Sequence, residues 1–295
     1  MVKSTGRKIF EVFNYTLMIL FCLIIILPFM HIISISLSNE EAIIKMSVTF
    51  WPKGWEFQAY KDILQDPIFL RTVANTVFIT ITVTILNLII DVMAAYAFTK
   101  KFYAKTFFNY YFILTMYFSG GLIPFYLLMT KYLQLQDTYL ALILPSLVNV
   151  FYIIVIRTQI EAIPSSLINA ALIDGASQSQ VLFNIVVPSI IPTIAAIGMF
   201  IALGTWNSWF NVMIFINDNN KWMLQYYLRK VVMEKMLPAS INEIYQKMLE
   251  MGTIQVRPEN YQMAAIILVA LPIVCIYPFV QKYFVKGILV GSVKE

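Results

Sequence analysis

Few side chains in this sequence suit acid, base or metal chemistry, and they stand far apart. The sequence contains one histidine, His31, and two cysteines, Cys22 and Cys275. A metal site needs several such ligands, and a nucleophilic triad needs a histidine beside its nucleophile. These residues therefore predict neither catalytic nor metal-ligating side chains. Both cysteines lie in apolar runs, where we expect buried packing.

Two charged residues, Asp91 and Arg157, stand within long apolar segments. A charge inside a membrane is costly, which makes each a candidate for function. If the two segments span a membrane, both charges lie at a comparable depth from one surface, and an ion pair between them is the expected arrangement. Such a pair would clamp two helices without a role in transport. A proton relay is less favoured, because no further acids line the apolar segments.

Aromatic rings and amides gather in the stretch GTWNSWFNVMIF. Sugars are bound by this combination, since apolar ring faces stack on aromatic side chains while hydroxyls need donors and acceptors. Tryptophan is also typical of membrane–water interfaces, so an interfacial belt with helix packing is the alternative. The candidates for a substrate path are Trp206, Asn207, Trp209 and Asn211.

The elements that carry these residues must be membrane helices. The chain has 295 residues, of which 60% are hydrophobic and 13% charged, and its mean hydropathy is +0.75. Soluble domains are about 45–50% apolar and about 25% charged. The composition excludes a disordered protein and a nucleic-acid-binding protein with a basic face. We therefore predict an all-α integral membrane protein, and interpret the net charge of +5 as a topology signal.

Six apolar segments are long enough to cross a bilayer core of about 30 Å. The longest uncharged run, residues 175–217, would be about 65 Å long as a single helix, so it must be divided. Pro188 and Pro192 mark the division. Gly120–Gly121 is expected to break the third span. The predicted membrane domain covers 12–295 after an N-terminus at 1–11, with spans at about 12–37, 73–98, 106–131, 138–161, 186–216 and 262–284.

Basic residues orient these spans. The N-terminus carries three of them before the first span, and the short segment 100–105 has three lysines and no acid. Lys and Arg are retained on the cytoplasmic side, so both termini and the loop 162–185 are predicted to be cytoplasmic. Loops 38–72 and 217–261 are then external. Their aromatic residues indicate either ordinary loops that cover helix ends or a docking surface for an extracellular partner.

The loop 162–185 contains two helical patterns. Two serines can cap a helix at Leu167–Asp174, and Gly175 is expected to end it in a left-handed conformation. A second amphipathic stretch covers Ser177–Val187. Two short helices of this kind favour a compact docking element, with an interfacial position on lipid headgroups as the alternative.

This loop resembles the EAA loop of ABC-importer permeases in the segment NAALIDGASQSQVLFNIVVPSIIP, where a small-small-x-x-Asp-Gly-Ala core leads to Ile-x-x-Pro. The resemblance extends over essentially the whole chain. Four further segments resemble carbohydrate-uptake permeases of the MalG type, and especially their LplC-like branch, which is linked to oligosaccharide and polysaccharide import: AAYAFTKKF at 94–102, FSGGLIPFYLL at 118–128, ALILPSLVNVFYIIVIRT at 141–158 and YFVKGILVGSVKE at 283–295.

The resemblance implies one subunit of a larger importer in a bacterial cytoplasmic (inner) membrane. Such permeases form a heterodimer with a second homologous permease, and they bind two copies of a cytoplasmic ATPase and an extracellular or periplasmic solute-binding protein. The chain itself would then not be an enzyme and would bind no cofactor, because Mg-ATP would be bound by the partner ATPase. In agreement, the sequence has no G-x-x-x-x-G-K-[ST] phosphate loop.

The resemblance also implies which residues couple the chain to the ATPase. Alanines would permit close approach to a cleft on that partner, while a leucine and an isoleucine would supply apolar contact. The family's leading glutamate is Asn169 here, so this position can offer a neutral hydrogen bond but not a charge-assisted one. Weaker docking, a matched change on the ATPase and reliance on the second permease's own loop are the open alternatives. The coupling residues are Asn169, Ala170, Ala171, Leu172, Ile173, Asp174, Gly175 and Ala176.

Three other functions are open. An ABC permease for a solute other than a sugar would share the coupling loop but not the carbohydrate-class segments. A self-sufficient secondary transporter predicts inverted repeats and further buried titratable residues, and the sequence shows neither. A membrane scaffold that transports nothing would leave the coupling loop without a use.

Overall fold

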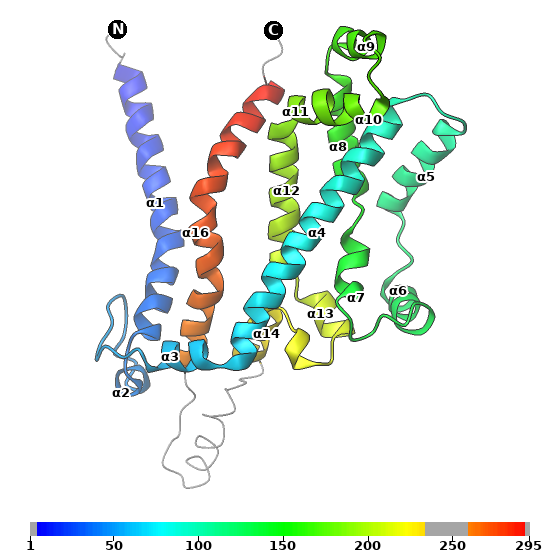
Figure 1. The fold of residues 1–295 in the computed structure, drawn as a ribbon. Helices are drawn as coiled ribbons and strands as arrows, with labels where there is room; N and C mark the ends of the chain where they lie inside the picture. The colour runs from blue at the N-terminus through cyan, green and yellow to red at the C-terminus, as the bar shows by residue number, and fades with distance from the viewer. Residues whose placement is uncertain (1–4, 234–258, 293–295) are drawn as a thin grey trace. The chain divides into compact units, whose positions relative to one another are not determined.

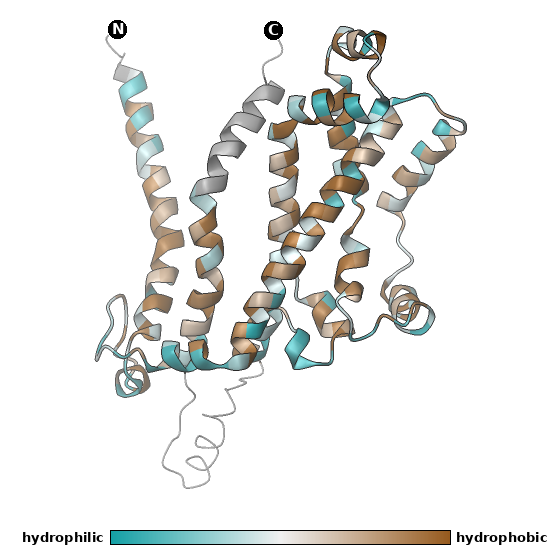
Figure 2. Cartoon of the chain, viewed as in Figure 1, coloured by the Kyte–Doolittle hydropathy of each residue, from teal (hydrophilic) through white to brown (hydrophobic). Residues whose placement is uncertain are grey.

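Helices make up nearly all of the computed structural model, which describes residues 5–233 and 259–292 (Figure 1). No strand occurs among these described residues, and the all-α prediction is confirmed. Three helices are long and apolar enough to cross a membrane alone, and three bent helix pairs raise the number to six if each pair is one span. Figure 2 shows apolar residues along the helix middles and polar residues in the connections. Where the membrane surfaces lie along these helices stays a prediction.

The chain forms two compact units, and the first comprises residues 1–70 and 228–272. The hydroxyl oxygens of Ser36 and Tyr60 lie 2.7 Å apart, and Nδ1 of His31 lies 2.7 Å from the carbonyl oxygen of Thr49. These two contacts hold the segment after the first long helix against that helix. The unit contains α1 (Thr5–Ser36), α2 (Glu40–Ile44), α3 (Gln58–Gln65), most of α14 (Leu224–Met233) and the beginning of α16 (Glu259–Ser292).

The two cysteines differ from expectation. Cys22 in α1 and Cys275 in α16 are both exposed, so the prediction that they are buried was wrong. An apolar run in a membrane helix does not identify the side that packs on protein, because lipid tails accept apolar side chains equally well.

The second unit comprises residues 71–227 and 273–295, and α4 runs along its full length (Figure 1). Buried side chains of α4, including Ile79, Val83 and Ala95, belong to one apolar core with those of α8 and α12. The helical elements are α4 (Pro67–Thr99), α5 (Lys105–Tyr117), α6 (Leu122–Leu127), η1 (Leu128–Tyr132), α7 (Leu140–Ile143), η2 (Leu144–Ser146), α8 (Val150–Glu161), α9 (Ser165–Ile173), α10 (Gln178–Val181), η3 (Leu182–Val186), α11 (Val187–Ser189), α12 (Ile191–Trp206), α13 (Phe210–Phe215) and η4 (Asn219–Lys221).

Three bends interrupt the apolar segments of this unit. The chain turns by 110° between α5 and the helix that begins at Leu122, by 43° before α8, and by 81° between Ser189 and Ile191. The first bend confirms the predicted break. It occurs at Gly121, which adopts a φ of +86° that glycine accepts readily. The third confirms that the long run divides near its prolines. Pro192 lies in the first turn of α12, where a helix does not need its missing N–H.

The break after α5 gives a first prediction. We expect Gly121→Ala to destabilise the protein by about 1–3 kcal/mol, because a φ of 86° with a ψ of 170° is a conformation essentially restricted to glycine. Space is not the reason, since an added Cβ would lie 4.0 Å from Pro124 Cδ. The midpoint of thermal unfolding of the purified protein measures the effect.

Gly120→Ala is the matched control for this prediction. Its added Cβ would lie 3.9 Å from Pro124 Cβ, but Gly120 does not have the left-handed φ of its neighbour. Equal melting temperatures for the two alanine variants would contradict a conformational role for Gly121.

Candidate functional site

The loop 162–185 presents a nine-residue helix, α9, at one end of the second unit (Figure 1). The helix begins at Ser165 with Pro164 as its N-cap, and no side chain caps it. The expected start at Leu167 with serine caps was therefore wrong. Pro164 explains the difference, since its restricted φ of −53° places the chain for helix entry, and the serines then fall in the first turn.

The end of α9 follows the prediction. Gly175 has a φ of +86°. Its N–H donates to the carbonyl of Leu172 at 3.2 Å, and the N–H of Ala176 donates to the carbonyl of Ala171 at 2.9 Å. These two hydrogen bonds form a Schellman motif, which satisfies the last helical carbonyls. Asp174 is the C-cap residue and is exposed. The helix is thus closed by its own backbone and needs no partner to end there.

The two sides of α9 have opposite environments. Ala171 packs against the apolar core of the unit, whereas Asn169 and Ala170 are exposed. Ile173 is 86% exposed and Leu172 is 37% exposed. Exposed apolar side chains on a helix whose other side is anchored are typical of a docking surface.

A hollow of about 310 Å³ opens beside the C-terminal end of α9. Ser177 begins the next helix through a capping box with Gln180, which turns that glutamine toward its own backbone. A carboxylate and two amides border the hollow, so it suits a polar or basic side chain of a partner. Its lining residues are Asp174, Gly175, Ala176, Gln180, Asn184 and Ile185.

A hydrogen bond joins the loop to α4. The hydroxyl of Tyr96 donates to Oε1 of Gln178 at 2.7 Å, and the ammonium of Lys100 lies 4.3 Å from the Tyr96 ring centre. Val181 and Val186 are fully buried in the core that α4 shares with α8. Sequence reasoning missed the bond, because nothing in the spacing of Tyr96 and Gln178 relates them.

The predicted ion pair between Asp91 and Arg157 is absent. Arg157 donates through Nε to Glu161 at 2.8 Å and through Nη1 to Asn109 at 3.2 Å. Asp91 accepts instead from the backbone N–H of Asn149 at 3.2 Å. The reason is that α8 begins at residue 150, so Asp91 lies at its start, while Arg157 follows seven residues later, about 10 Å along the helix.

Asp91 and Asn87, one turn apart on α4, contact both sides of the break that precedes α8. Asn87 donates to the carbonyl of Ser146 at 2.7 Å, and Asp91 is fully buried against the N–H of Asn149. Asn149 in turn accepts from the first N–H groups of α8. Non-helical backbone at membrane depth must be satisfied inside the protein, and these three side chains do so.

The structure separates the members of the aromatic and amide set. Trp206 is 8% exposed and lines an apolar groove of about 490 Å³ between α4, α12 and α16. Asn207 is exposed and accepts from Gln225 of α14 at 3.0 Å, and Trp209 is 36% exposed. Asn211 is half-buried. Asn207 and Gln225 form a polar pair that the sequence did not predict. The only signal for it was the single amide side chain, Gln225, in the run WMLQYY.

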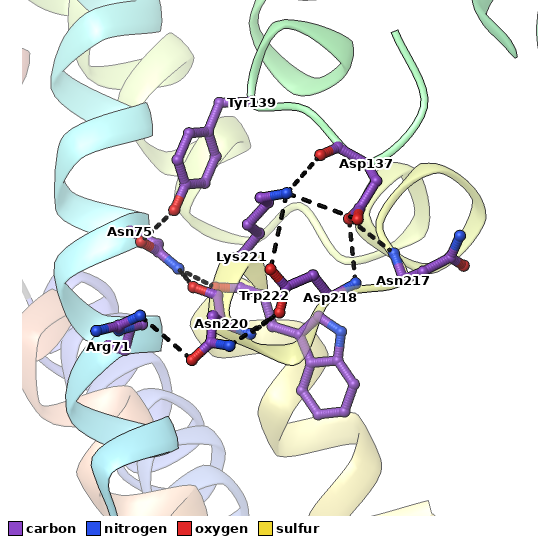
Figure 3. Close-up of polar contacts among 9 residues, drawn as sticks. All are labelled: Arg71, Asn75, Asp137, Tyr139, Asn217, Asp218, Asn220, Lys221 and Trp222. Carbon is purple, nitrogen blue, oxygen red and sulfur yellow. Dashed lines mark hydrogen bonds and ion pairs between the residues drawn. The ribbon is translucent and has the colours of Figure 1, made fainter.

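A polar network holds the turn at 217–222 onto α4 (Figure 3). Asn75 of α4 donates to the carbonyls of Asn220 at 2.8 Å and Trp222 at 3.0 Å, and it accepts from the hydroxyl of Tyr139 at 2.8 Å. Because α14 follows this turn directly, the network positions Gln225 beside Asn207.

Lys221 anchors the same turn to the segment before α7 (Figure 3). Its ammonium donates to the backbone carbonyl of Asp137 at 2.8 Å and lies 3.6 and 3.7 Å from the carboxylates of Asp137 and Asp218. Hydrogen bonds from the backbone and side chain of Asn220 hold the pKa of Asp218 below its usual range. Tyr226 and Tyr227, two aromatic residues of the loop predicted to be external, are buried within this unit.

Much of the external loop predicted at 217–261 cannot be placed, because residues 234–258 lie outside the described part of the chain. Metal-binding clusters are also absent from the residues that the structure describes.

Comparison with known proteins connects these features. Residues 92–290 match the family described as the binding-protein-dependent transport system inner membrane component. The chain is 34% identical to the polygalacturonan/rhamnogalacturonan transport system permease protein YtcP of Bacillus subtilis (strain 168), over 98% of this chain and 99% of YtcP. It is 37% identical to Protein LplC of the same organism, over 100% of this chain and 98% of LplC.

A solved structure agrees with these relatives. It shows a bacterial ABC transporter involved in the import of the acidic polysaccharide alginate. The match has a TM-score of 0.87 and 32% sequence identity, and it covers 96% of this chain and 99% of that chain.

The contacts of Asp91 give a second prediction. We expect Asp91→Leu to destabilise the protein by about 1–3 kcal/mol, because the N–H of Asn149 is left unsatisfied. Asp91→Asn retains an acceptor oxygen and should cost less than about 1 kcal/mol. Thermal unfolding of the purified variants measures both.

An ion pair would give a different result. Removing one partner of a buried pair costs about 3–5 kcal/mol, and Asp91→Asn would then be as harmful as Asp91→Leu. That outcome would restore the Asp91–Arg157 pair that the structure does not show.

Proposed function

Because the chain belongs to the family of binding-protein-dependent transport system inner membrane components, we propose that it forms part of the membrane path for an oligosaccharide or polysaccharide. It is the multi-pass permease component of an ABC importer, and ATP is hydrolysed on a separate subunit. The resemblance to LplC-like permeases is confirmed. Full-length similarity to a polygalacturonan/rhamnogalacturonan transport system permease and to an ABC transporter involved in alginate import supports the proposal of a carbohydrate.

The assembly that we propose contains more than this chain. A second homologous permease would complete the path, two cytoplasmic ATPase copies would bind Mg-ATP, and a solute-binding protein would deliver the sugar from outside. Both termini of this chain and the loop 162–185 would then face the cytoplasm. The basic segment 100–105 supports this orientation, since positive residues are retained on that side.

In this assembly α9 is the helix that fits a cleft on the ATPase. The proposal is supported by its anchored inner side and by the exposure of Ile173 and Leu172 on the other. Asn169 is exposed as well, so its amide is accessible to a partner. Asp174 and the hollow beside it would receive a polar or basic side chain of the same partner.

Movement of α9 would be transmitted by packing and by one hydrogen bond. The loop shares its buried valines with the core of α4 and α8, and Gln178 accepts from Tyr96 of α4. A displacement of α9 thus moves α4, and α4 carries Asn75 at its other end. Rigid packed elements of this kind can bring a switch at one surface to the opposite surface.

At that opposite end, the amides of Asn207 and Gln225 and the ring of Trp209 are the side chains offered to a sugar. Amides supply both donors and acceptors for hydroxyls, while an indole stacks on an apolar ring face. Trp206 is buried in the groove between helices, so in this arrangement it supports the site rather than touching substrate.

A coupling experiment tests the proposed assembly. The tagged chain, purified gently from its native membrane, should carry an ATPase and a second permease that mass spectrometry identifies. We expect Ile173→Ser to reduce the ATPase activity stimulated by the loaded binding protein at least about tenfold, because an exposed apolar contact of a docking helix is lost. Membrane insertion should be unchanged, since Ile173 is 86% exposed.

Tyr103→Ser is the matched control for the coupling experiment. Tyr103 is 97% exposed in the basic segment 100–105 and lies outside α9. A chain that purifies alone, or an equal loss of ATPase activity in both serine variants, would overturn the coupling role of α9.

A fourth prediction concerns the substrate path. We expect Trp209→Ala to lower carbohydrate uptake about fivefold, the loss of roughly 1 kcal/mol of stacking. Trp209→Phe retains an aromatic face and should restore most of the uptake. Uptake of labelled acidic and neutral oligosaccharides by cells that carry each variant measures both effects.

Subunit assembly is the control readout for this experiment. If Trp209 were only an interfacial anchor, both variants would either assemble poorly or transport normally. Either result would remove Trp209 from the substrate path.

A further inference from the structure

A cavity of about 310 Å³ lies between α5 and α8, at the end of the second unit that carries the loop 162–185. Its lining is mostly apolar and includes Ile113 and Ile154. Asn109 and Arg157 supply polar groups to the same cavity. The coupling and substrate sites use none of these four residues, so the cavity needs a separate explanation.

Arg157 is held in place at this cavity. Its Nε bonds Glu161 at 2.8 Å and its Nη1 bonds Asn109 at 3.2 Å, while the side chain keeps 30% of its surface exposed. A guanidinium has five N–H donors. The contacts that the structure describes engage Nε and Nη1, which leaves donors of Nη2 for a ligand.

A basic segment of the chain adjoins this cavity. The basic segment 100–105, which runs from the end of α4 into the start of α5, contains Lys100, Lys101 and Lys105, and among the described residues Glu161 supplies the carboxylate that contacts Arg157. Phe98 and Thr106, which flank this basic segment, both line the cavity. Its electrostatic potential therefore favours an anion.

The combination of an anchored cation and apolar walls selects an amphiphile. A free inorganic anion would gain nothing from Ile113 and Ile154, and an acyl chain alone would gain nothing from Arg157. Basic pockets between helices on the cytoplasmic side of a membrane are suited to anionic lipid headgroups.

We propose that this cavity binds an anionic phospholipid, whose phosphate accepts hydrogen bonds from Arg157 and whose acyl chain lies along Ile113 and Ile154. The proposal rests on the proposed function only in that it places this end of the helices in the inner leaflet. The lipid would fill the gap between α5 and α8 and hold α5 against the rest of the unit.

Native mass spectrometry of the assembled transporter tests this site. The complex is exchanged into detergent with equal amounts of phosphatidylglycerol and phosphatidylcholine. We expect the wild-type chain to retain phosphatidylglycerol selectively and Arg157→Gln to retain about fivefold less, the contribution of one basic residue at a membrane surface. Glu161→Gln is the matched control, because it removes the ion pair but keeps the cation, and it should retain at least as much lipid as wild type.

A second measurement needs no change at Arg157 and identifies the occupant. A photoreactive amino acid in place of Ile113 should yield an adduct with the mass of a phospholipid. An adduct with the second permease instead would show that a protein covers the cavity.

Three results of the lipid exchange would also overturn the proposal. Equal retention of both lipids would show that the headgroup charge is not recognised. Equal loss in Arg157→Gln and Glu161→Gln would show that the ion pair maintains the helices and binds no phosphate. Displacement of the lipid by excess inorganic phosphate would identify a site for a free anion.

Discussion

Satisfaction of backbone polar groups at the breaks in the helices is the constraint on which the second unit depends. A membrane offers no water to an unpaired N–H or carbonyl, so an interrupted helix persists only where the protein supplies partners. Asn87 and Asp91 supply them from one face of α4, and Asn149 caps the helix that resumes. The carboxyl group of Asp91, which the sequence marks as a candidate for function, thus has an architectural role as a hydrogen-bond acceptor.

Tight anchoring and free exposure are combined in α9. Its Schellman motif closes the helix without outside help, and Ala171 attaches one side to the core. The opposite side leaves Ile173 uncovered, at a cost in solvation that docking onto another protein would remove. A helix that is rigid before it binds loses little conformational entropy on docking, which favours transmission of movement over local adjustment.

Patterns local in sequence predicted local structure well. The left-handed end at Gly175, the break at Gly121 and the division near Pro192 each depend on one residue's own conformational preferences. Pairings between distant segments were not predictable, because helix length and capping decide them. Asp91 does not pair with Arg157, because α8 begins later than a full span would require. Tyr96 bonds Gln178 through tertiary packing alone. The prediction that the cysteines are buried was wrong because hydropathy does not distinguish a side chain that faces lipid from one that packs on protein.

The continuity of α4 limits how such a chain can change in evolution. Asn75 and Tyr96, near opposite ends of the helix, each bond a different connecting segment. Inserting or deleting one residue between them would rotate one end against the other by about 100° and shift it by about 1.5 Å. Both attachments could not then survive, so length variation should be excluded from this stretch.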